Sequence, residues 1–262
     1  MPLALEPHPL PLFLEGPVRR LKLDFPRAEK EALAGKVRES GLYDRVLNMY
    51  KVNESLSAVS YEAGRALAFT PGWLENESIW LHMEYKYLLE LLKSGLYRQF
   101  GEAFHDAAIP FLDPARYGRS PLESVSFLAS SANPDPSVWG RGFVARLSGS
   151  TAELLQIWQL LFFGPAPFQW DGRDLSLDFT PFIPAYLMPK DGVIEATFLG
   201  GVKVVYHAAG LTELLPGKTV PVRWELTDRD GGKRIVEGPV LGDRDARAVR
   251  AGQVGEINIT MK

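Results

Sequence analysis

A short glycine-containing turn carries the side chains of this chain best suited to hold an anion. Residues 147–153, LSGSTAE, place the hydroxyls of Ser148, Ser150 and Thr151 around Gly149, directly before the apolar run LLQIWQLLFF. A helix that starts here would leave several backbone amides unpaired at its positive end, where phosphate and other oxyanions bind. The same residues could instead form a capping box, Ser150 to Glu153, with no ligand. No Gly-Lys-Ser/Thr follows, so a nucleotide-binding loop is excluded.

A second group of polar candidates lies at residues 75–82. Glu75 and Asn76 precede an amphipathic pattern that contains His82. Carboxylates and amides pair with sugar hydroxyls, and an imidazole can donate to a phosphate or sugar oxygen. Each also has a simpler explanation. Acidic residues stabilise a helix N-terminus without any ligand, and many histidines lie in the core with their ring nitrogens hydrogen-bonded within the protein. Four tryptophans could stack on sugar rings or fill the core, and none is assigned to the site: Trp73, Trp80, Trp139 and Trp158.

Composition excludes several other classes of chemistry. The chain has no cysteine, its four histidines lack HExxH or similar spacing, and no GxSxG nucleophile elbow occurs. The net charge of -3 gives no positive field for nucleic acid or an anionic membrane. The first residues lack a basic n-region, and no apolar stretch reaches the roughly 20 residues that span a bilayer. We therefore expect a cytoplasmic protein with no metal, nucleic-acid or membrane partner.

The elements that would position these residues differ between the two ends of the chain. Helices are predicted over residues 26–39, over residues 79–92, around Phe100 and Phe104, and from capping boxes at Ser120 and Ser150. The loop between the last two, residues 130–143, is rich in proline and glycine, and we place it at the mouth of a site.

After Gly164 the pattern changes to short runs of Val, Ile, Thr and aromatic residues, separated by turn dipeptides such as Asp171-Gly172. Alternation at residues 220–226 predicts a half-buried strand, and residues 255–260 predict a final one. The expected fold is part of an (α/α)6 helical toroid over residues 1–164, followed by an antiparallel β-sandwich over residues 165–262.

The helical part poses a packing problem, because it supplies only about half the helices of a closed toroid and should expose an apolar face. We expect a missing N-terminal part of the protein, or a second copy, to cover that face. Its candidate residues are Leu33, Val37, Leu42, Val46 and Leu47.

Two segments resemble a known family. Residues 71–82, PGWLENESIWLH, resemble the Pro-Gly…Lys-Glu-Asn-Gly-Gly-Ile-Phe-x-His segment of glycoside hydrolase family 94, the cellobiose, chitobiose and oligoglucan phosphorylases. Residues 147–152, LSGSTA, are similar to its Leu-Thr-Gly-Thr-Ala-Ala segment. The wider likeness covers most of residues 12–190 and is nearest to the oligoglucan-phosphorylase-like branch, often labelled cellobiose phosphorylase. The resemblance implies a phosphate site at His82, Ser148 and Gly149 and a sugar site at Glu75 and Asn76.

The implied reaction is inverting phosphorolysis of β-linked gluco-oligosaccharides, which yields an α-sugar 1-phosphate. Inorganic phosphate is then the co-substrate, and no organic or metal cofactor is required. The family's aspartate general acid lies in an earlier segment of the barrel, so this chain has no assigned catalytic residue and we expect it to be inactive alone. Leu74 replaces the motif lysine, Glu77 and Ser78 replace the glycine pair, and Ser148 replaces threonine. Sugar preference therefore does not carry over.

Two alternatives remain open. A non-catalytic carbohydrate-binding or partner-covering module would keep Glu75, Asn76 and the aromatic residues but would not need the anion site. A related glucan hydrolase or transferase fragment would share the helical fold and use water or a sugar acceptor in place of phosphate. The chain could be a fragment of a longer protein or a stand-alone product.

Overall fold

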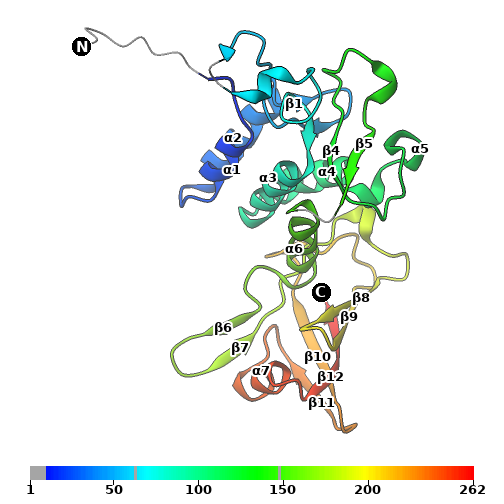
Figure 1. Ribbon diagram of the computed structural model, residues 1–262. Coiled ribbons are helices and arrows are strands. Elements are labelled where there is room, and N and C mark those ends of the chain that lie inside the picture. The colour runs from blue at the N-terminus through cyan, green and yellow to red at the C-terminus, as the bar shows by residue number, and fades with distance from the viewer. Residues whose placement is uncertain (1–9, 62–63, 147–148) are drawn as a thin grey trace. The chain divides into compact units, whose positions relative to one another are not determined.

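The computed structural model describes residues 10–61, 64–146 and 149–262 and has mixed α and β structure (Figure 1). The chain forms two compact units, Met1–Ile157 and Trp158–Lys262. The boundary falls within the long helix α6, Gly149–Phe163, a few residues before the expected boundary after residue 164.

The first unit combines helices with short strands. In chain order it contains α1 (Glu15–Leu21), α2 (Arg27–Glu39), β1 (Tyr43–Asp44), β2 (Met49–Tyr50), β3 (Ile79–Trp80), α3 (Leu81–Lys93), α4 (Tyr97–Ala107), α5 (Pro114–Tyr117), β4 (Val125–Leu128), β5 (Gly142–Ala145) and the first part of α6. Short 3-10 helices lie at Arg65–Ala68, Ile109–Phe111 and Pro136–Val138. The helices predicted over residues 26–39, over 79–92 and around Phe100 and Phe104 are confirmed as α2, α3 and α4.

Helix α3 is the centre of this unit rather than an amphipathic surface helix. It packs against α1 on one side and α4 on another, and it also contacts strand β4. Its buried residues lie on nearly every side: Leu81, Glu84, Tyr85, Tyr87, Leu88, Leu89, Glu90, Leu91 and Leu92. A helix that is apolar almost all round belongs in a core. His82, Met83 and Lys86 remain partly exposed.

The helix predicted from Ser120 is wrong. The Ser120 hydroxyl accepts the amide of Leu122, and the chain makes only one turn before it enters strand β4. Residues Val125–Leu128 are all buried and pair antiparallel with both β3 and β5. The β-branched and aromatic residues of this strand thus outweigh the capping signal in front of it. The loop of residues 130–143 connects two strands and not two helices.

The second unit is built on a five-stranded sheet in the order β11-β10-β12-β9-β8. Its elements are β6 (Phe168–Trp170), β7 (Leu175–Leu177), a 3-10 turn (Ala185–Leu187), β8 (Val193–Phe198), β9 (Val202–His207), β10 (Pro221–Asp228), β11 (Lys233–Glu237), α7 (Asp243–Arg250) and β12 (Val254–Met261). The strands predicted at residues 220–226 and 255–260 are confirmed as β10 and β12.

This sheet departs from the strictly antiparallel arrangement expected, because β12 pairs parallel to β9. Helix α7 was also not predicted. It lies in the connection between β11 and β12 (Figure 1) and buries Ala246 and Val249. Parallel neighbours need a crossover, and β12 follows such a helical connection before it enters the sheet between β9 and β10. The core on one side of the sheet includes Trp224, Tyr206, Phe179 and Ile257.

The residues named for an exposed apolar face on the first helices do not form one. Val37, Leu42 and Leu47 are at most 7% exposed, and of the named residues only Val46 is more than half exposed. No helix in the described ranges combines the length and apolar character that crossing a bilayer requires.

Candidate anion site

His82 and Gly149 lie in direct contact in the first unit. His82 is the second residue of α3, which follows strand β3 without a linker, and Gly149 is the first residue of α6. A β-carbon built on Gly149 would lie 2.3 to 2.5 Å from three atoms of the imidazole ring, a distance at which real atoms overlap. Only glycine therefore lets the His82 ring approach the N-terminus of α6 this closely.

The surroundings of His82 control its charge. Partial burial lowers the pKa of the imidazole below its ordinary value, and the nearby Lys86 ammonium lowers it further. Glu153 opposes both effects, with its Oε1 at 3.6 Å from Nε2. This separation is too long for a hydrogen bond, so the pair is a loose electrostatic contact. The imidazole is therefore mainly neutral near pH 7 and can donate one ring N–H to a ligand.

The first turn of α6 contributes two hydroxyl residues with different roles. Ser150 lies inside the helix, and its hydroxyl contacts the Ser124 hydroxyl at 2.9 Å and the Val125 carbonyl at 3.4 Å. The helix start predicted here is confirmed, but Ser150 as its N-cap is wrong, because this hydroxyl ties α6 to strand β4. Thr151 Oγ1 is buried and has no hydrogen-bond partner in the described part of the chain. Ser148 lies outside the described residues.

Glu75 and Asn76 belong to a tightly held turn. Asn53 is fully buried, donates to the Glu75 carbonyl at 2.7 Å and accepts the Glu77 amide at 2.7 Å. The Glu75 carboxylate pairs with Arg65 at 2.6 Å. Asn76 is buried, donates to the Phe69 carbonyl at 2.7 Å, and its Oδ1 has no partner among the described residues. Across those residues, the polar contacts of Glu75 and Asn76 do not include His82 or α6.

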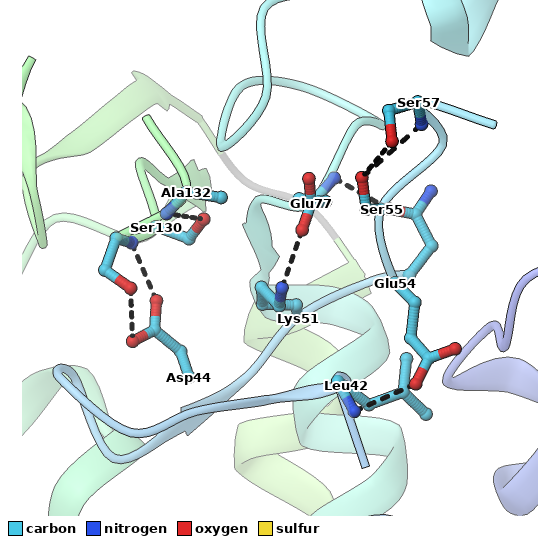
Figure 2. Close-up of polar contacts among 12 residues, drawn as sticks. Leu42, Asp44, Lys51, Glu54, Ser55, Ser57, Glu77, Ser130 and Ala132 are labelled. Atoms are coloured by element: carbon cyan, nitrogen blue, oxygen red, sulfur yellow. Dashed lines mark hydrogen bonds and ion pairs between the residues drawn. The ribbon is translucent and has the colours of Figure 1, made fainter. Parts of the chain in front are cut away.

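Two carboxylates that were not assigned to the site, Glu77 and Glu84, are buried. Glu77 is 7% exposed and pairs with Lys51 at 2.8 Å (Figure 2). Glu84 is fully buried; burial raises its pKa to about 8, and its Oε1 accepts the Tyr50 amide at 2.8 Å. Its Oε2 has no hydrogen-bond partner in the described ranges. A glutamate inside the apolar run LHMEYKYLLELL was the sequence signal available for Glu84.

Comparison with known proteins assigns no function to these residues. No protein-family model matches the chain, and the search of curated proteins finds no significant match. Within residues 10–61, 64–146 and 149–262, no three His, Asp or Glu side chains come together as metal ligands would. The site therefore rests on its own contacts: an imidazole held against a helix N-terminus, with a buried hydroxyl in the first turn of that helix.

Proposed function

We propose that this chain supplies the phosphate site, and part of the sugar site, of an inverting glycoside phosphorylase that acts on β-linked gluco-oligosaccharides. The observation that carries the proposal is the contact between His82 and Gly149. Sequence resemblance pairs these residues as phosphate ligands although 67 positions separate them, and the chain folds so that the imidazole touches the glycine. A neutral imidazole, the amides of a 15-residue helix and its dipole together suit a phosphate dianion.

A second observation supports the resemblance from the backbone. Glu77 occupies a position where the family motif has glycine, and its φ of 58° lies in the left-handed region. Non-glycine residues adopt this conformation only at a cost, whereas glycine adopts it freely. Here the cost is offset by the ion pair with Lys51 and by the hydrogen bond from the Glu77 amide to Asn53. The turn thus keeps a glycine-like shape without the glycine.

In the proposed reaction a phosphate oxygen attacks the anomeric carbon as the glycosidic C–O bond breaks. An aspartic acid gives its proton to the leaving sugar oxygen, and an α-sugar 1-phosphate is released. No residue of this chain is assigned that acid role, which the resemblance gives to an earlier segment of the family's barrel. His82 and α6 would hold the attacking phosphate in position and stabilise its charge.

Phosphate binding to the full 262-residue chain tests the proposal. We would titrate inorganic phosphate and follow the C2 and C4 proton signals of His82 by NMR. The His82 pKa should start below its ordinary value and rise when phosphate binds, because the dianion favours the imidazolium. His82→Ala and Gly149→Ala should each weaken phosphate binding about tenfold or more, since a hydrogen bond to a charged group contributes about 1.5–3 kcal/mol.

His105→Ala is the matched control, because His105 is a more exposed histidine of the same unit that lies beside Asp106. It should leave phosphate binding unchanged. Phosphate that leaves the His82 signals unmoved, or binds the His82→Ala variant equally well, would contradict the proposed site. Release of sugar 1-phosphate by the purified chain alone would contradict the assignment of the general acid to another segment.

A further inference from the structure

A second candidate site lies within the unit Trp158–Lys262, on the hairpin formed by β6 and β7. Trp170 ends strand β6 and pairs across the hairpin with Leu175. The Leu175 side chain is buried, whereas Trp170 remains 56% exposed. An indole that exposes over half of its surface has an apolar face available to a ligand.

Hydrogen bonds fix the hairpin backbone that carries this indole. Asp171 Oδ1 accepts the amides of Arg173 and Asp174, each at 2.8 Å, and so rigidifies the tip of the hairpin. Asp243, the first residue of α7, accepts the Leu175 amide at 2.7 Å and thereby ties the hairpin to the helix. Because this backbone is already ordered, binding a ligand on it costs little additional conformational entropy.

Arginine side chains support one side of the ring. Arg247 donates from Nε to Asp243 at 2.7 Å, and its guanidinium lies 5.4 Å from the centre of the Trp170 ring. Arg250 stacks near the neighbouring Phe168 at 5.9 Å. Each guanidinium thus lies over an aromatic ring of the hairpin, and more than half of the Trp170 surface remains exposed.

Two shallow cavities, both wide open to solvent, meet at Trp170. One, of about 360 Å³, is lined by Trp170, Leu175, Ala251, Arg247 and Arg250. The other, of about 430 Å³, is lined on its polar side by Gln169, Asp171, Asp174, Ser176 and Asp243. Volumes of a few hundred Å³ are typical of sites for small ligands. Arginines on one side and carboxylates on the other nearly balance in charge, which disfavours a strongly anionic or cationic ligand.

We propose that this hairpin surface binds a neutral oligosaccharide, with a sugar ring stacked on Trp170 and its hydroxyls paired with polar groups of the two cavities. A sugar ring has an apolar C–H face that suits an indole, and its hydroxyls both donate to carboxylates and accept from guanidinium groups. The site does not involve His82 or Gly149, so this proposal can be tested independently of the proposed phosphate site.

Isothermal titration of the full chain with cello-oligosaccharides and laminari-oligosaccharides tests this proposal, with phosphate omitted. Trp170→Ala should weaken binding about tenfold, because aromatic stacking contributes about 0.5–1.5 kcal/mol beyond area burial. Trp170→Tyr should retain part of the affinity. Tyr186→Ala, which removes another exposed aromatic residue of the same unit, is the matched control and should bind as the unaltered chain does.

The His82→Ala variant separates this proposal from the phosphate site, since it should keep its oligosaccharide affinity while losing phosphate. The proposal is overturned if neither oligosaccharide series binds at millimolar concentration, or if Trp170→Ala binds them unchanged with an unchanged melting temperature. Sedimentation that shows Trp170-dependent self-association without glycan binding would also overturn it, because the surface would then be a protein contact.

Discussion

The two units stabilise their interiors by different means. Every buried Asp, Glu, Asn or Ser among the described residues lies in the first unit: Asp44, Asn53, Asn76, Glu77, Ser78, Glu84, Glu90, Ser126, Ser130, Asn133 and Ser150. The second unit, which is described in full, has a core of aliphatic and aromatic residues on one side of its sheet. The difference follows from how the backbone of each unit satisfies its hydrogen bonds.

In the second unit the backbone amides and carbonyls of the strands pair with one another in long ladders. Its interior therefore needs few polar side chains. In the first unit the strands are short and the connecting segments are irregular. Their amides are paired by side chains instead. Asp44, for example, accepts the amides of Val46, Leu47 and Ser131. A few polar contacts thus hold the irregular segments of the first unit, and their loss should matter more than the loss of similar contacts in the second unit.

The largest expected effect comes from breaking the Lys51–Glu77 pair (Figure 2). Lys51→Met would leave the Glu77 carboxylate buried without a partner, in a turn that already holds a left-handed residue. We expect a loss of about 3–5 kcal/mol in the free energy of unfolding of the first unit. Urea denaturation combined with amide hydrogen exchange, followed in each unit, would measure it. Amides of β10 and β12 should retain their protection.

A matched control and a second variant make this comparison sharper. Arg98→Met removes the cation of an exposed pair with Glu102 and should change stability by less than about 1 kcal/mol. The double variant Lys51→Met/Glu77→Gln removes both charges and should regain much of the loss. Equal destabilisation in the single and double variants would show that the shape of the turn, and not the ion pair, is what matters.

The second prediction uses the buried Glu84, whose pKa of about 8 exceeds its ordinary value mainly because of burial. Between the ordinary glutamate pKa and pH 8 the folded state keeps a proton that the unfolded state has lost. The free energy of unfolding should therefore fall as pH rises through this window, by up to about 1.4 kcal/mol per pH unit. Glu84→Gln should flatten that decline, because a neutral amide carries no ionisation penalty.

Chemical denaturation of the first unit at several pH values from 5 to about 8.5 would reveal this dependence. Glu39→Gln, on the exposed end of α2, is the control and should leave the pH profile as it was. A Glu84→Gln variant whose stability declines with pH as steeply as that of the unaltered chain would rule out Glu84 as the titrating group.

Which elements the sequence could predict depends on their local patterns and not on the unit in which they lie. Regular elements with their own periodicity, such as α2, α4, β10 and β12, were predictable from local patterns alone. Strand β4 was not, because a local capping signal at Ser120 competes with burial that only tertiary pairing creates. Helix α7 did carry a signal, with acidic residues in its first turn and arginines in its last, but its weak apolar pattern concealed it.

For the candidate site, the residue types were visible and the contacts were not. The chemistry of His82 and Gly149 follows from the sequence, whereas their approach depends on how α3 and α6 pack. Asn53 gave no sequence signal at all, because a buried amide that holds a distant turn has no characteristic spacing. Trp170 gave no sequence signal for a related reason. A tryptophan that stacks on a ligand differs from a core tryptophan in its solvent exposure, and the sequence does not report exposure.

The smallest expected effect tests the second unit with a comparable charge network. Arg234 on β11 donates to both oxygens of Asp228 and to Asp245 in α7, each at 2.6 Å, and so ties the β10–β11 hairpin to the helix. Its side chain is 23% exposed, against 12% for Lys51, and we expect water to reach the two aspartates once the arginine is gone. Arg234→Met should therefore cost only about 1–2 kcal/mol in the free energy of unfolding, less than Lys51→Met in the first unit.

Amide exchange in β10, β11 and α7 would report the loss, and added salt should reduce the difference between the variant and the unaltered chain because exposed charges are screened. A loss as large as that from Lys51→Met would mean that the second unit depends on buried charge as heavily as the first, and the contrast between the two interiors would fail.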